Sequence, residues 1–172
     1  TPQSLPYTQD FSSFNGSVTT YPVGWQGWTI TGSTSTSYST AAPSGDQALI
    51  GAANSNTSAF VGDMNTKIGM LNTSSALKSI CLALNTTGLG SISVSYSAAT
   101  QRQQNANRIG AIGLQYRVGT SGAFTNIAST DYQNPGGSDN TSGTGSLSPQ
   151  TISVTLPNAC ENQSNLQLRW VY

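Results

Sequence analysis

A strict alternation of apolar and polar residues in the second half of the chain constrains its fold more than any other feature. In the segment 91–97, Ile92, Val94 and Tyr96 alternate with serines. The same period of two recurs at 112–118, 152–156 and 166–172. Successive side chains of a β-strand point to opposite faces of a sheet. Each segment is therefore predicted to be a strand with one buried face and one solvated face.

Shorter strands are expected earlier in the chain, at 26–31, 46–51, 58–62 and 79–84, and no segment has the apolar stripe and caps of a helix. Long polar loops are expected at 32–45, 97–108 and 129–149. A chain of 172 residues can form one domain with a substantial core. We predict a single all-β domain over 1–172, a jelly-roll-like antiparallel β-sandwich with about eight or nine strands.

Charge and composition exclude several classes of protein. The chain has six basic and six acidic residues and a formal net charge of zero. That balance gives no basic surface for nucleic acid, and no apolar run is long enough to span a membrane. Charged residues make up 7% of the chain, against about 25% in ordinary soluble domains. This neutral polar composition is typical of exported proteins, so we expect an extracellular or cell-surface location after removal of a signal peptide.

Catalysis is not expected. The chain has no histidine, so it cannot form a Ser-His-Asp or Cys-His arrangement or offer an imidazole to a metal. The few carboxylates are scattered, and no cofactor motif is present. A calcium site is a weaker hypothesis that would use Asp131, Asp139 and Asn140 with loop carbonyls as oxygen ligands. Turn residues that bond their own backbone are the alternative explanation for these side chains.

Aromatic residues suggest one kind of binding site. Sugar-binding proteins stack flat rings against saccharides, and four aromatic residues are candidates for this role: Trp25, Trp28, Tyr38 and Tyr132. Aromatic residues near a first strand also pack in cores, so a structural role is the alternative. Trp170 follows the alternation of Leu166 and Leu168 and is predicted to lie in the core.

The two cysteines, Cys81 and Cys160, leave two possibilities open. A disulfide would close a loop of about 80 residues and stabilise the fold by about 4 kcal/mol in the chain-entropy treatment. Alternatively, both are buried thiols that act as small apolar side chains.

Several short segments together resemble one group of bacterial exported proteins. The segments lie at 5–12 (LPYTQDFS), 22–28 (PVGWQGW), 67–73 (KIGMLNT), 114–120 (LQYRVGT) and 166–171 (LQLRWV). In order and spacing they are similar to the jelly-roll-like β-sandwich domains at the N-terminus of large secreted or cell-surface proteins. Such proteins often use a type IX secretion route, and some carry nuclease-like, lamin-tail-like or sorting domains downstream.

The resemblance implies a non-catalytic module for adhesion, scaffolding or ligand display. In that group a further strand with an Ile-Asp-Asn or Ile-Asp-Asp step follows the Arg-Trp segment, and residues 1–172 lack this closing strand. Either the chain is the N-terminal part of a longer protein, or a strand from a neighbouring subunit completes the sheet edge. The functional hypotheses are therefore the display module, a carbohydrate-binding module that recognises glycans, and a filament or assembly subunit.

Overall fold

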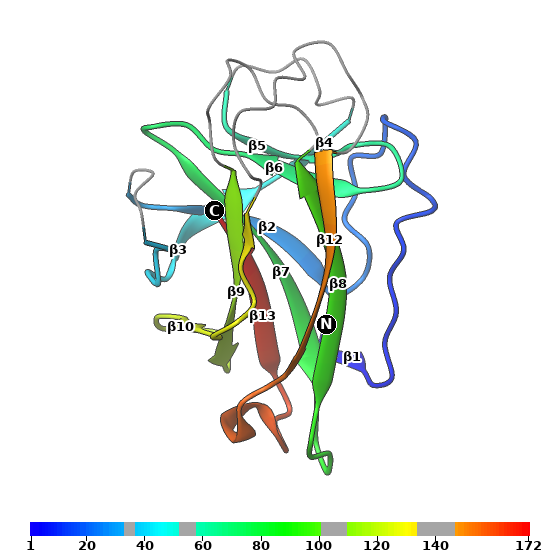
Figure 1. Cartoon of the computed structure of the whole chain (residues 1–172), viewed down its shortest axis with the longest axis vertical. Helices are drawn as coiled ribbons and strands as arrows, with labels where there is room; N and C mark the ends of the chain where they lie inside the picture. The colour runs from blue at the N-terminus through cyan, green and yellow to red at the C-terminus, as the bar shows by residue number, and fades with distance from the viewer. Residues whose placement is uncertain (33–36, 52–57, 101–109, 134–146) are drawn as a thin grey trace.

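The computed structural model describes residues 1–32, 37–51, 58–100, 110–133 and 147–172, and within them the chain is all-β (Figure 1). The strands are β1 (Gln3–Ser4), β2 (Trp25–Ile30), β3 (Pro43–Gln47), β4 (Leu49–Ile50), β5 (Phe60–Asp63), β6 (Ile68–Leu71), β7 (Leu77–Asn85), β8 (Ser93–Thr100), β9 (Ala111–Val118), β10 (Thr125–Asn126), β11 (Tyr132–Gln133), β12 (Leu147–Thr155) and β13 (Leu166–Val171). A short 3-10 helix spans Asn158–Cys160. No helix in the described part of the chain has the length and apolar character to cross a membrane.

One large sheet forms the first layer of the molecule. Its strand order is β10-β9-β13-β7-β2-β3, with β1 added to β7 and β11 to β9. Apart from the β1–β7 pair, its strands run antiparallel. The last strand, β13, lies in the interior of this sheet, with β7 on one side and β9 on the other.

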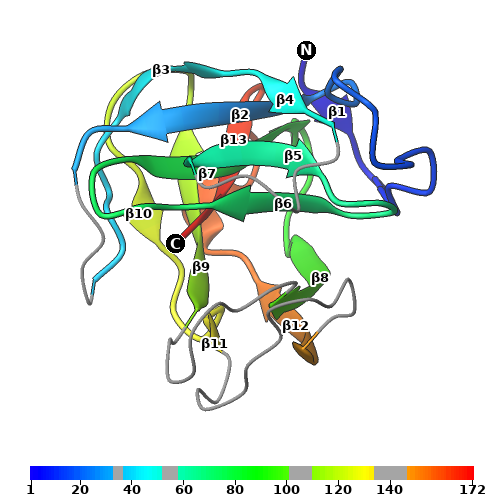
Figure 2. The same cartoon turned by 90° about the horizontal axis from the view of Figure 1, so that it is seen from above.

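Two smaller sheets form the second layer. β4, β5 and β6 make a three-stranded sheet that crosses the top of Figure 1, and β8 and β12 make a two-stranded antiparallel sheet along one side (Figures 1 and 2). Both small sheets pack their apolar residues against the same face of the large sheet. The prediction of an all-β sandwich built mainly from antiparallel strands is therefore confirmed.

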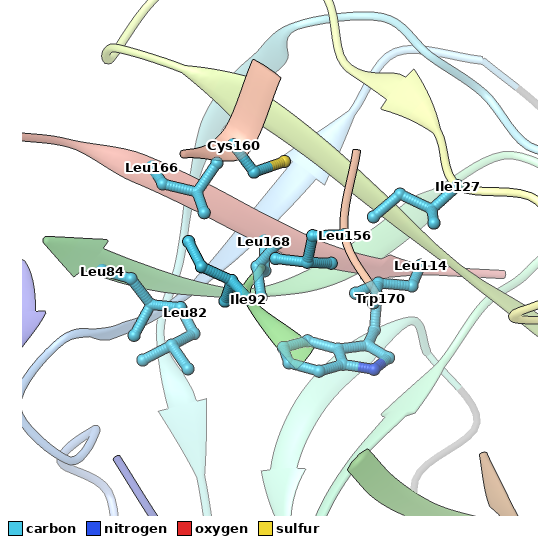
Figure 3. Packing of buried hydrophobic residues seen from close by; sticks show 10 residues of the cluster. All are labelled: Leu82, Leu84, Ile92, Leu114, Ile127, Leu156, Cys160, Leu166, Leu168 and Trp170. Carbon is cyan, nitrogen blue, oxygen red and sulfur yellow. The ribbon is translucent and has the colours of Figure 1, made fainter. Parts of the chain in front are cut away.

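The main core lies between β8–β12 and the centre of the large sheet (Figure 3). Apart from Ile127 and Cys160, its buried apolar side chains come from the alternating positions that the sequence pattern marks. The buried members are Leu82, Leu84, Ile92, Leu114, Ile127, Leu156, Cys160, Leu166, Leu168 and Trp170. Burial of a leucine-sized side chain contributes about 1.5–3 kcal/mol, so this cluster dominates the stability of the sandwich.

A second cluster lies under β4–β6, where a buried carboxylate fixes the neighbouring loop. Asp63, at the end of β5, is fully buried, and its Oδ2 accepts hydrogen bonds from the backbone N–H groups of Asn15, Gly16 and Val18 at 3.1, 2.9 and 2.9 Å. Its Oδ1 accepts one from Asn65 at 2.8 Å. Burial raises the pKa of Asp63, but these backbone donors outweigh it and hold the pKa below its ordinary value.

The longer strands agree with the expected segments to within a few residues, whereas β6 was not expected. Its sequence, Ile-Gly-Met-Leu, has no alternation to mark it. Each segment expected to be a loop contains some strand: β8 extends into 97–108, β11 and the start of β12 lie in 129–149, and β3 begins within 32–45.

Candidate functional site

The face of the large sheet opposite the core carries a layer of buried polar side chains. The layer contains Gln115 and Arg117 on β9 and Gln167 and Arg169 on β13. The antiparallel register sets Arg169 opposite Gln115. It likewise sets Gln167 opposite Arg117. Each glutamine is therefore placed to accept hydrogen bonds from the arginine of the other strand.

Arg169 is fully buried, and its guanidinium group is hydrogen-bonded on all three nitrogens. Its Nε donates to Oε1 of Gln115 at 2.8 Å, and Nη2 donates to the same oxygen. Nη1 donates to the carbonyl of Ala41 at 2.8 Å, and Nη2 donates to that of Ser39 at 2.9 Å. Through these bonds, Arg169 of β13 holds the segment 37–43 against this face of the sheet.

Arg117 makes a similar but less complete set of contacts. Its Nε donates to Oε1 of Gln167 at 3.0 Å, Nη2 donates to the same oxygen, and Nη1 donates to the carbonyl of Gly122 at 2.8 Å. The five N–H groups of a guanidinium can donate five such bonds. One N–H on each Nη atom of Arg117 therefore finds no acceptor among the described residues.

Aromatic rings pack against both guanidinium groups. The centre of the Phe124 ring lies 3.8 Å from Cζ of Arg169 and 4.4 Å from Cζ of Arg117. The centre of the Trp28 ring lies 5.5 Å from Cζ of Arg117. These are cation–π distances, and the aromatic rings stabilise the two buried cations.

A surface hollow opens beside Trp28 and Arg117. It is a shallow, open depression of about 310 Å³, and the residues that line it are Trp28, Ala42, Pro43, Arg117, Thr120, Ser121 and Gly122. β2 supplies Trp28, β9 supplies Arg117, and the turn after β9 supplies Thr120 and Ser121, two residues with hydroxyl groups. A flat ring, a cation and hydrogen-bonding groups thus meet in one concave surface.

The hollow is electropositive. Burial lowers the pKa of Arg117 and lowers that of Arg169 to about 10, with the charge of Arg117 adding to the effect on Arg169. Both groups remain cationic at neutral pH. Among the described residues, no carboxylate forms an ion pair with either arginine. Within the described ranges, neutral oxygens and aromatic rings are the groups that contact the two guanidinium charges.

Of the four aromatic candidates for ligand binding, only Trp28 lines the hollow. Trp25 stacks on Trp170 with their ring centres 5.5 Å apart, and its indole N–H donates to the hydroxyl of Tyr7 at 2.7 Å. Tyr132 is buried, and its hydroxyl accepts a hydrogen bond from the backbone N–H of Thr100 at 2.8 Å. The structure therefore places Trp25 and Tyr132 in packing positions.

Tyr38 also packs against the large sheet, next to Ile30, Leu77 and Val171. Burial and the negative charge of Asp131, to which it is hydrogen-bonded, raise the pKa of Tyr38 to about 12. Its hydroxyl therefore remains protonated at neutral pH. The ring of Tyr38 covers part of the polar face of the large sheet.

The calcium hypothesis gains no support from the described residues. Asp131 is exposed and interacts with Tyr38, while Asp139 and Asn140 lie outside the described residues. The part of the chain that the structure describes contains no group of three or more potential metal-binding side chains.

The structure decides between the two possibilities for the cysteines, because both are free thiols. Cys81 lies opposite Arg169 on the polar face of β7, and burial raises the pKa of its thiol. Cys160 packs in the main core beside Leu166 (Figure 3), where burial and the charge of Glu161 raise its thiol pKa to about 11. The large sheet separates the two side chains, so the disulfide hypothesis is wrong.

Sequence reasoning did not select Arg117, although a signal for it was present. Both β9 and β13 contain the pattern Leu-Gln-x-Arg. When two such strands pair in antiparallel register, each glutamine faces the other strand's arginine. The repeated pattern could therefore have predicted a buried polar layer on this face.

Comparisons with known proteins add no relative. No protein-family model, curated protein sequence or solved structure matches the chain. The functional hypotheses accordingly depend on the geometry of the hollow and on the sequence.

Proposed function

We propose that this protein is a non-catalytic, extracellular β-sandwich module that binds a saccharide in the hollow beside Trp28. One observation carries the proposal: a partly exposed indole forms a wall of a concave surface that also presents hydroxyls and a guanidinium. Aromatic rings provide large apolar contact area against a flat ligand, and a few polar groups fix its orientation. Saccharide rings have one apolar face and a rim of hydroxyls, which matches this combination.

The size and openness of the hollow suit a small part of a glycan. Its volume of about 310 Å³ is at the lower end of the range for small-molecule sites. One sugar unit of a longer chain would fill it, while the neighbouring units would extend over the surface. Such a site serves adhesion or ligand display, in which many weak contacts act together.

The absence of histidine and the low charge of the chain support the non-catalytic and extracellular parts of this proposal. Acid–base catalysis at neutral pH most often uses a histidine or a carboxylate with a shifted pKa. The described wall of the hollow contains neither.

A glycan array, followed by calorimetric titration of the best glycan, tests the proposal. We expect Trp28→Ala to weaken binding at least tenfold and Trp28→Phe to weaken it less, because phenylalanine keeps a flat ring. Val23→Ala is the control, since Val23 is 69% exposed and does not line the hollow. Absence of binding to any glycan, or equal binding by the wild type and Trp28→Ala, would refute the proposal.

A second candidate function is assembly through a sheet edge. In the described residues, β8 and β12 pair only with each other, so each has an outer edge that faces no other strand of the described chain. Such edges can pair with a strand from another chain. Light scattering at increasing protein concentration tests this function: growing, heat-stable polymers support it, and a monomer throughout refutes it.

A further inference from the structure

The charge of the hollow narrows the class of saccharide. Arg117 is 6% exposed, lines the hollow, and has two N–H groups without an acceptor among the described residues. A buried cation is normally paired, because removing an unpaired charge from water is strongly unfavourable. An anion that entered the hollow would give this guanidinium the partner that the described protein groups do not provide.

The second arginine strengthens the same field. Arg169 lies on the neighbouring strand, and both guanidinium groups contact the ring of Phe124. The other described residues that line the hollow carry no formal charge. The nearest acidic neighbour of Trp28 along the sheet is Asp46, which pairs with it across β2 and β3 but is exposed and does not line the hollow.

We propose that the ligand is an acidic saccharide, with its sugar ring against Trp28 and its carboxylate on Arg117. This inference rests on the proposed saccharide binding and specifies its chemistry. A guanidinium favours a carboxylate because two parallel N–H groups match two carboxylate oxygens. A uronic acid carries its carboxylate on the same ring that stacks, so one sugar unit can make both contacts.

Three methyl glycosides that differ only at C6 separate the contribution of charge from that of the ring. These are methyl glucuronide, its uncharged methyl ester and methyl glucoside. The chain has three tryptophans, so the indole N–H region of a nitrogen–proton correlation spectrum contains three signals. Trp28→Phe identifies the signal of Trp28, and its shift during titration gives the dissociation constant of each glycoside.

We expect the glucuronide to bind at least tenfold more tightly than the ester and the glucoside, which should resemble each other. Added salt should weaken only the glucuronide, because salt screens charge–charge attraction. Replacing Arg117 itself could disturb the fold, so the charge is tested at the exposed rim residue Ser121. Ser121→Asp should bind the glucuronide about five- to tenfold more weakly than Ser121→Asn, with no such difference for the glucoside.

The outcomes distinguish this inference from the proposed function. Equal binding of glucuronide and glucoside, with the Trp28 signal shifting for both, overturns the inference and leaves saccharide binding intact. A preference for neutral glycans on the array does the same. Acetate alone shifting the Trp28 signal as strongly as glucuronide would indicate a simple anion site and overturn both. No shift with any glycoside and no binding on the array also overturns both.

Discussion

The buried carboxylate of Asp63 gives the sharpest stability prediction, tested by the substitution Asp63→Asn. Asparagine has nearly the same shape but no charge, and one of its terminal groups is a donor. Three backbone N–H groups point at Oδ2 and one points at Oδ1. If the new amide oxygen takes the Oδ2 position, the amide NH₂ faces the N–H of Asn65, donor against donor.

The expected loss follows from these contacts. A hydrogen bond to a charged group contributes about 1.5–3 kcal/mol, whereas a neutral one contributes about 0.5–1.5 kcal/mol. Three bonds weakened by about 1 kcal/mol each and one lost bond of about 1.5–3 kcal/mol therefore predict a decrease of about 4.5–6 kcal/mol in the free energy of unfolding at pH 7. That is a large part of the 5–15 kcal/mol typical of a whole domain.

The pH dependence supplies a second measurement. Because the folded-state pKa of Asp63 is lowered, its stabilisation is fully present above the unfolded-state value of about 3.9 and is lost as the pH falls through the folded-state pKa. The difference in stability between the wild type and Asp63→Asn should stay constant from about pH 7 to pH 5 and shrink below about pH 4. Asp10, whose pKa the N–H of Ser12 also lowers, is common to both proteins and cancels.

Urea denaturation between pH 3 and pH 7, followed by tryptophan fluorescence, measures both effects. Asp46→Asn is the matched control, because Asp46 is an exposed carboxylate on the edge strand β3. It should change stability by no more than about 0.5 kcal/mol. If Asp63→Asn is as stable as Asp46→Asn, or if its stability falls in parallel with that of the wild type below pH 4, the explanation for Asp63 is wrong.

Three further substitutions or reagents test other parts of the fold. Gly27→Ala would place a Cβ 2.0 Å from Oη of Tyr21, so it should displace that ring and lower stability by about 1–3 kcal/mol, measured by urea denaturation. Arg169→Lys cannot reach all the acceptors of the guanidinium and should cost about 2–4 kcal/mol by the same assay. Cys81 and Cys160 should react with a thiol reagent only after unfolding, giving two thiols per chain.

Each of these predictions has a control and a contrary result. Gly45→Ala, where a Cβ would have no atom within 4 Å, should be nearly neutral, and an equal loss at both glycines would contradict the steric explanation. Lys67→Arg, at an exposed residue, is the charge-conserving control for Arg169→Lys. A chain that shows no thiol after unfolding without reductant would contain a disulfide after all.

The alternation predicted the main strands and the main core because it reports directly on which side chains face the interior. Leu166, Leu168 and Trp170 lie where their period of two places them. The same pattern misled at the intervening positions. Gln167 and Arg169 were expected on a solvated face, yet both are buried. Their polar atoms are hydrogen-bonded there: Gln167 accepts from Arg117, and Arg169 donates to backbone carbonyls of the segment 37–43.

The candidate site was predicted only in part, for a related reason. Trp28 was among the aromatic candidates, but its sequence surroundings do not distinguish it from Trp25, which stacks in the core. The difference is set by Arg117 and the turn after β9, which are far from Trp28 in sequence and near it in space. Short-range patterns carry no information about such long-range contacts.

The crossed glutamine–arginine pairs have a consequence for how β9 and β13 find their alignment. A slide of two residues leaves every apolar side chain on the core face, so hydrophobic patterning cannot reject it. One such slide would set Arg169 against Arg117, and the opposite slide would set Gln167 against Gln115 and leave Arg169 opposite Gly113. Either shifted register would leave buried guanidinium groups without their hydrogen-bond acceptors, at a cost of several kcal/mol. The polar layer therefore selects a single alignment among those that the apolar layer tolerates equally.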